Sequence, residues 1–229
     1  MTIAEVPSLL LRRPNVFWSE DIRQQSTRKP TLLLYLVAMI GYTVYGAILG
    51  IGNGPMQVLA SASKLPALYI LTIAICFPVL HVLNLLFGGQ SKASEMMLLL
   101  LTGLAATATI LVAFAPISVF FWVTGCGYDF YRLLNLVIIG VASFIGFRLF
   151  VKGCSSLAGD APDSSLGTRK QLLRSWVFLV AFVGCQLSWT MRPFFGTPTL
   201  EFSVFRKQEG NFVQSVAGGI AKVFQFDGD

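Results

Sequence analysis

The sequence predicts an all-α fold, a polytopic transmembrane bundle of about five helices, and three observations support this. First, 55% of the 229 residues are hydrophobic and only 12% are charged, about half the charged share of a typical soluble domain. Second, the chain holds several nearly uncharged stretches of about 20 residues, long enough for a helix to cross a hydrocarbon core. Third, most Lys and Arg residues lie at the ends of these stretches or in the tails, where they can meet lipid headgroups.

Turn residues or polar segments separate the apolar stretches. We predict spans over residues 31–52, 66–87, 96–115, 130–151 and 172–191, which together make a transmembrane bundle over residues 31–191. Residues 1–30 are predicted to be a cytoplasmic leader at the membrane interface. Residues 192–229 are predicted to form an extramembrane tail with amphipathic character.

Three segments beside these spans are ambiguous. Residues 53–64 open with the turn signal Asn-Gly-Pro, and we predict a short interfacial helix that ends at Lys64. A re-entrant segment is the alternative. The apolar run that follows Pro116 is predicted to be a bent extension of the third span that lies at the interface, and residues 152–171 a hydrophilic linker.

Pro78, His81 and Asn84 make the second span the most polar part of the predicted bundle. A proline in mid-helix frees a carbonyl group, so His81 fits a neutral imidazole bonded to that carbonyl, to Asn84 or to Gln186. The alternatives are a proton relay or a ligand for a cofactor or pigment, because an ionisable residue in a span is a functional candidate. One histidine without Cys or carboxylate partners builds no zinc site. We therefore predict no bound metal or cofactor.

Small residues mark two of the spans. Gly46 and Gly50 match a small-xxx-small pattern, and the third span has a centre rich in Gly, Ala and Thr. Such faces let helices approach closely, and we predict packing within the protein. Asn135 is predicted to form a helix-helix hydrogen bond.

Aromatic and basic residues near the ends of spans are predicted to be interface anchors. These anchors are Trp122, Trp176, Trp189 and Arg192. Asp129 and Arg132, at the entrance of the fourth span, fit the same role.

The distribution of basic residues favours a cytoplasmic N-terminus. The larger share of the 17 Lys and Arg residues then lies inside. The cations left outside are Lys64, Arg132, Arg192, Arg206, Lys207 and Lys222.

Several short motifs resemble those of uncharacterised bacterial multi-pass inner-membrane proteins. They are Tyr45-Gly, Lys64-Leu-Pro, Ile75-Cys-Phe-Pro, Gly88-Gly, Trp189-Thr-Met-Arg-Pro-Phe-Phe-Gly and Gly210-Asn-Phe. The five-span plan with a cytoplasmic N-terminus is similar to that of the Yip1-type membrane proteins. The resemblance implies a bacterial inner-membrane location, and it carries no activity or functional residue to this chain.

Three functions fit these patterns. The first is a non-catalytic scaffold or accessory subunit of a larger membrane complex. It would contact membrane lipids and other integral membrane proteins, or further copies of itself, through the small-residue faces of the first and third spans. The second is a small channel or transporter with a path near His81 and Asn84, and the third is a cofactor- or pigment-binding subunit. With one histidine and no acidic residue in any predicted span, we expect no enzyme. Without basic runs interleaved with aromatics, we expect no nucleic-acid partner.

Overall fold

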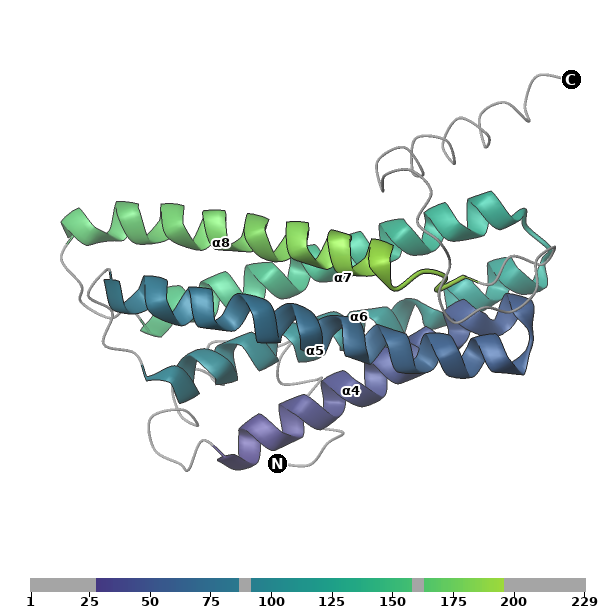
Figure 1. Ribbon diagram of the computed structural model, residues 1–229, viewed down its shortest axis with the longest axis horizontal. Helices are drawn as coiled ribbons and strands as arrows, with labels where there is room; N and C mark the ends of the chain where they lie inside the picture. The colour runs from purple at the N-terminus through teal and green to yellow at the C-terminus, as the bar shows by residue number, and fades with distance from the viewer. Residues whose placement is uncertain (1–27, 87–91, 158–162, 196–229) are drawn as a thin grey trace, which may run out of the picture.

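The computed structural model describes residues 28–86, 92–157 and 163–195, and these residues form a bundle of long helices (Figure 1). The helices are α4 (Arg28–Gly50), α5 (Pro55–Leu86), α6 (Ala93–Val123), α7 (Tyr128–Leu157) and α8 (Asp163–Thr190). A short 3-10 helix, η1 (Ile51–Asn53), lies between the first two. The described residues contain no strand, so the predicted all-α fold is confirmed.

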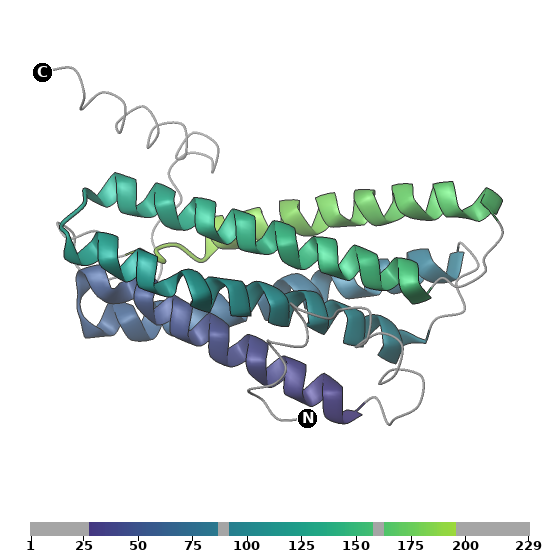
Figure 2. The same cartoon turned by 180° about the vertical axis from the view of Figure 1, so that it is seen from behind.

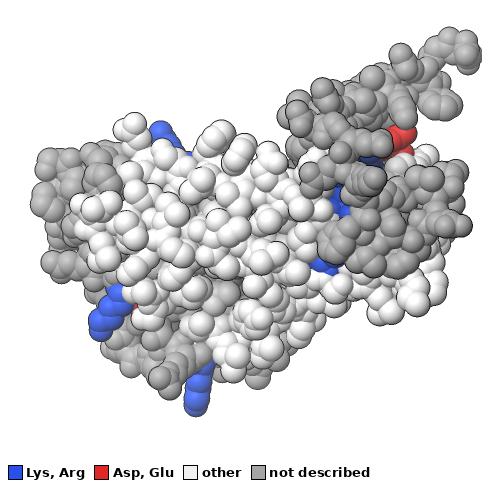
Figure 3. Space-filling model, in the orientation of Figure 1, with Lys and Arg blue, Asp and Glu red and all other residues white. Residues whose placement is uncertain are grey.

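Each of the five helices contains a stretch long and apolar enough to cross a membrane. On the face shown in Figure 3, basic side chains lie toward the two ends of the bundle, with a broad uncharged surface between them. A surface of this kind suits hydrocarbon rather than water. The predicted number of spans is therefore confirmed.

The central helix of the bundle is α6, since 67% of its most apolar stretch is buried against 11% for α8. The helix α4 packs against both α5 and α6, while α7 packs against the other side of α6 (Figure 2). The last helix, α8, lies along α5 (Figure 1). The rings of Phe150 on α7 and Trp176 on α8 are 5.1 Å apart, which brings α8 against α7 as well.

Glycines allow the closest helix crossings. A Cβ atom added to Gly46 or Gly50 on α4 would lie 2.5 or 2.6 Å from a backbone carbonyl oxygen of α5. A Cβ atom on Gly103 of α6 would lie 3.0 Å from the carbonyl oxygen of Gly146 on α7. Since only glycine fits at this distance, the small-residue faces pack within the protein, as predicted. They are not left for a partner at these positions, which contradicts their expected use in a scaffold.

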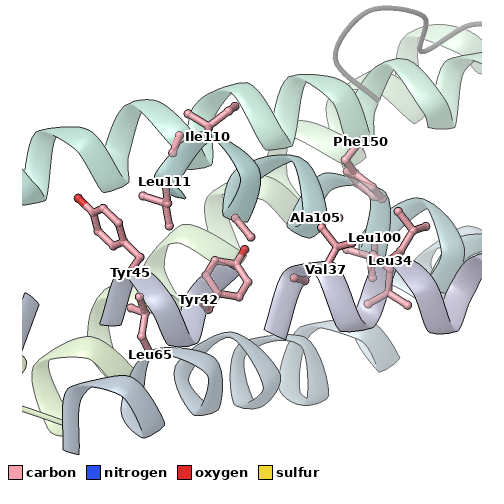
Figure 4. Packing of buried hydrophobic residues seen from close by; sticks show 14 of the residues in the cluster. Leu34, Val37, Tyr42, Tyr45, Leu65, Leu100, Ala105, Ile110, Leu111 and Phe150 are labelled. Atoms are coloured by element: carbon pink, nitrogen blue, oxygen red, sulfur yellow. The ribbon is translucent and has the colours of Figure 1, made fainter. Parts of the chain in front are cut away.

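The core lies between α4 and α6. Figure 4 shows Leu34, Val37 and Tyr42 of α4 facing residues of α6 that include Leu100 and Ala105. The Tyr42 hydroxyl donates a hydrogen bond to the carbonyl oxygen of Leu104 at 3.0 Å. This bond gives a polar group in the bundle centre a partner, which an apolar environment demands.

The predicted interfacial helix over residues 53–64 is wrong, and so is the re-entrant alternative. Gly54, with φ of 85°, makes the turn, and α5 begins at Pro55 and continues through Lys64 to Leu86. Proline suits the first turn of a helix, where its missing N–H group is not needed. The segment appeared to be interfacial because it is polar, but its polar side chains pack inside the bundle, as described below.

The helices also extend beyond other predicted limits. The helix α6 continues through Pro116 to Val123, so residues 116–123 are part of one long helix. Most of the predicted linker over residues 152–171 is helical, because α7 ends at Leu157 and α8 begins at Asp163. Hydropathy identifies only the part of a helix that lies inside the membrane. Backbone hydrogen bonds can extend the helix beyond that part. The predicted leader (1–30) and tail (192–229) lie almost entirely outside the described residues.

Candidate functional site

His81 and Asn84 lie on α5, and both side chains are half-buried. The Nδ1 atom of His81 is buried and has no hydrogen-bond partner among the described residues. The imidazole stacks with the ring of Phe77, and the two ring centroids are 6.2 Å apart. Nδ1 therefore makes none of the hydrogen bonds considered for His81, to Asn84, to Gln186 or to a freed carbonyl, within this part of the chain.

Gln186 does not lie beside His81 and Asn84. It is exposed on α8, and two contacts set the register of α8 against α5. Trp176 bonds the carbonyl oxygen of Cys76, and Gln57 bonds that of Pro193. In this antiparallel register Gln186 lies level with a position near residue 65, about 24 Å along α5 from His81 at 1.5 Å per residue.

The four predicted anchors differ in their surroundings. Trp122 is 41% exposed at the end of α6, where it can reach lipid headgroups. Trp176 is only 2% exposed, and its indole Nε1 donates to the carbonyl oxygen of Cys76 at 2.9 Å. A side chain buried to this extent cannot contact headgroups, so the anchor interpretation of Trp176 is wrong. Trp189 is also buried, and the guanidinium carbon of Arg192 lies 3.1 Å from the centre of its ring.

A buried polar cluster that the sequence did not predict joins α4, α6 and α7. The Tyr45 hydroxyl and the Ser118 hydroxyl both donate to Oδ1 of Asn135 at 2.8 Å. The Asn135 amide donates to the carbonyl oxygen of Tyr131, and the Tyr131 hydroxyl donates to that of Ile48. Tyr45, Ser118 and Asn135 are each 0% exposed. Because every member has a partner, the cluster can hold these three helices in one register.

A second polar group joins α5 to the segment after α8, residues 191–195. The Ser61 hydroxyl donates to the carbonyl oxygen of Phe194 at 2.6 Å, and Gln57 donates to the carbonyl oxygens of both Pro193 and Phe194. The Lys64 ammonium donates to the carbonyl oxygen of Pro193 at 3.1 Å. Gln57, Ser61 and Lys64 are all buried. Together they bind the end of α8 to the start of α5.

Arg132 and Arg192 lie beside these two groups. The rings of Tyr131 and Phe195 are 6.1 Å apart, so the start of α7 adjoins the 191–195 segment. Burial lowers the pKa of Arg192 from its ordinary value, and the positive charge of Arg132 lowers this pKa further. The guanidinium groups of Arg132 and Arg192 therefore repel one another electrostatically, at the end of the bundle where Lys64 is buried.

The spacing of the second polar group was visible in the sequence. Gln57, Ser61 and Lys64 recur at intervals of four and three residues, which places them on one face of a helix. This pattern indicates a helix that buries a polar stripe. Ser118 has no such signal, since it is a single polar residue in an apolar run.

Neither region forms a metal site among the described residues, where no three His, Cys, Asp or Glu side chains come together. The five apolar helices define the chain as a multi-pass integral membrane protein. Comparisons of the chain with models of protein families, with curated proteins and with solved structures found no match.

Proposed function

We propose that this membrane protein is a non-catalytic accessory subunit that packs against another membrane protein through the outer face of α7. The observation that supports this most is Gly140. It is exposed, and a Cβ atom added to it would have no neighbour within 4 Å. At the α4–α5 and α6–α7 crossings, neighbouring helices occupy the space beside the glycines. The space beside Gly140, which we call the notch, is unoccupied in the described part of the chain.

The surroundings of Gly140 suit a helix as partner. Val137 is 62% exposed and Phe144 is 61% exposed on the same face of α7. A glycine between larger apolar side chains lets a second helix approach its backbone, and close packing is what drives helix association in lipid.

The test is copurification of the full chain from native membranes in mild detergent. Gly140→Leu fills the notch and is expected to remove at least one copurifying membrane protein, whereas Gly140→Ala is expected to keep it. Gly184→Leu is the matched control, because Gly184 on α8 also has no neighbour within 4 Å. If Gly140→Leu retained every copurifying protein, or if the wild-type chain brought down none, the proposal would be wrong.

A second candidate function is binding of a cofactor or pigment at His81, and the unpartnered buried Nδ1 atom favours it. A neutral imidazole can ligate a metal-centred cofactor through either ring nitrogen. The absorption spectrum of the purified chain tests this candidate directly. A visible band that is lost in His81→Leu at unchanged protein abundance would support it, and a spectrum with protein absorbance alone would exclude it.

A further inference from the structure

Three basic residues from different parts of the chain lie toward one end of the bundle. Lys64 lies on α5 and Arg132 near the start of α7, while Arg192 follows α8. The contact between Lys64 and Pro193 (3.1 Å) and that between the rings of Tyr131 and Phe195 (6.1 Å) bring them around the 191–195 segment. In the predicted orientation, these three residues are the basic residues closest to the spans on the outer side of the membrane. Basic residues are least favoured near the ends of spans on that side.

At this end of the bundle the described residues include fewer acidic than basic side chains. Among the described residues only Asp129 lies here, one turn before Arg132. Glu95 and Asp163 stand at the starts of α6 and α8, at the opposite end. Cations gathered in and beside a low-dielectric bundle repel one another and are expensive to desolvate. An arrangement of this kind is favourable when an anion completes it.

Arg192 is already held in a fixed position. Its Nε atom donates to the carbonyl oxygen of Trp189 at 3.1 Å, and its guanidinium plane lies over the Trp189 ring. The two terminal nitrogens have no hydrogen-bond partner among the described residues. A planar guanidinium fixed at one edge presents its other donors as a fork, the geometry that matches phosphate oxygens.

We propose that Lys64, Arg132 and Arg192 form a binding site for a phosphate group at the end of the bundle where α5 begins and α8 ends. Arg192 donates from its terminal nitrogens, Arg132 binds from α7, and the buried Lys64 adds positive charge from beneath the 191–195 segment. Phosphate fits better than carboxylate, because its charge and its several acceptor oxygens suit three donors. The group can belong to the headgroup of an anionic phospholipid or to a soluble phosphate compound.

The experiment uses the full chain in nanodiscs and tests the two sources of phosphate, lipid and soluble, in separate arms. In the lipid arm, discs contain phosphatidylcholine with a minor share of phosphatidylglycerol, and native mass spectrometry measures which lipid stays on the protein. In the soluble arm, discs contain phosphatidylcholine alone, and calorimetry measures binding of inorganic phosphate and pyrophosphate. Arg132→Gln and Arg192→Gln remove the proposed ligands. Arg148→Gln removes one charge from an exposed position near the other end of α7 and is the matched control.

We expect the wild-type chain to retain phosphatidylglycerol selectively or to bind a soluble phosphate saturably, and the successful arm identifies the source. Each glutamine variant at the site should weaken that binding about tenfold, the loss typical for one charge-assisted contact. Arg192→Lys, which keeps the charge, should lose less than Arg192→Gln, and Arg148→Gln should bind as the wild type does. If Arg192→Gln failed to fold, the half-exposed Arg132 would decide the outcome. Absence of binding in both arms, or an equal loss in Arg148→Gln, would overturn the proposal.

Discussion

The side chain of Asn135 accepts hydrogen bonds from Tyr45 on α4 and Ser118 on α6, and it is itself part of α7. Polar bonds of this kind between membrane helices contribute about 0.6 kcal/mol on average and rarely more than 1.7. Asn135 is 0% exposed, so neither water nor lipid headgroups can replace its contacts. Its removal would leave the Tyr45 hydroxyl without its acceptor, and the Ser118 hydroxyl with only the Tyr131 hydroxyl at 3.2 Å.

Asn135→Ala is therefore expected to destabilise the bundle by about 1–2 kcal/mol. Denaturation of the purified chain by SDS, followed by circular dichroism, measures the change in the free energy of unfolding. Val137→Ala, two residues away and 62% exposed, is the control and should change stability much less. Equal losses in the two variants would mean that the polar cluster contributes nothing of its own.

Sequence reasoning identified the kind of bond that Asn135 makes but not its partners. Tyr45 is 90 positions away along the chain, and no spacing rule connects residues so distant. Trp176 shows the reverse case, where a composition rule misled. A tryptophan near the end of a span is typically an interface anchor, yet here its indole bonds a backbone carbonyl inside the bundle.

At the scale of helices, the crossing of α4 and α5 depends on two glycines one turn apart. The ideal Cβ position at Gly50 is 2.6 Å from the carbonyl oxygen of Gln57 and 2.7 Å from the Cα atom of Val58. Both neighbours are backbone atoms, which cannot move aside as a flexible side chain can. A methyl group at this position must therefore push the two helices apart.

Gly50→Ala is expected to lower stability by about 1–3 kcal/mol through overpacking, even though alanine is the better helix former. Thermal denaturation of the detergent-solubilised chain measures this loss as a lower midpoint temperature. Gly140→Ala, at a glycine with open space around it, should be neutral or slightly stabilising. A Gly50→Ala chain as stable as the wild type would show that α4 and α5 can pack with more space between them.

The sequence predicts the number of helices better than their ends. Long apolar stretches identify spans because lipid excludes charge, and all five correspond to helices. Polar flanking sequence offers no such constraint, so it predicts a separate interfacial helix over residues 53–64 and a linker over residues 152–171. The deciding factor at the start of α5 is tertiary, since its polar side chains find carbonyl partners in the 191–195 segment. A single sequence does not reveal that pairing.

For the molecule as a whole, the distribution of basic residues predicts which end faces out. The positive-inside rule predicts that the end with the α6–α7 turn is outside. Cys126 lies in that turn, between Val123 and Tyr128. Of the other cysteines, Cys76 and Cys154 are buried and Cys185 lies within α8. Cys126 is thus a natural reporter of orientation.

In a variant that keeps only Cys126, a membrane-impermeant maleimide is expected to label the protein in intact spheroplasts. Burial raises the pKa of the Cys126 thiol above its ordinary value. The reactive thiolate is therefore scarcer at neutral pH than in an exposed cysteine, and the labelling rate should keep rising to a higher pH. Cys126→Ser in the same background is the control. Labelling that required permeabilised membranes would reverse the orientation.

The sequence also predicted which charges lie near the two ends of the bundle, but not which helices would be neighbours. Lys64, Arg132 and Arg192 were assigned to one side from their positions relative to the spans, and the fold brings them together around one short segment. Their convergence depends on α8 returning beside α5. Hydropathy carries no information about that contact.

The central position of α6 bears on how the protein is made. The helix α4 is synthesised before α5 and α6, and both of these helices pack against it. The helix α7 then packs against α6. Each of these helices therefore packs against a helix that was synthesised earlier. The last helix, α8, packs along α5, so this contact can form only after all the other helices have been made. A nascent chain halted before α8 would hold a nearly complete interior, while Gln57, Ser61 and Lys64 would still lack the carbonyl groups of residues 193 and 194 that they bond in the finished molecule.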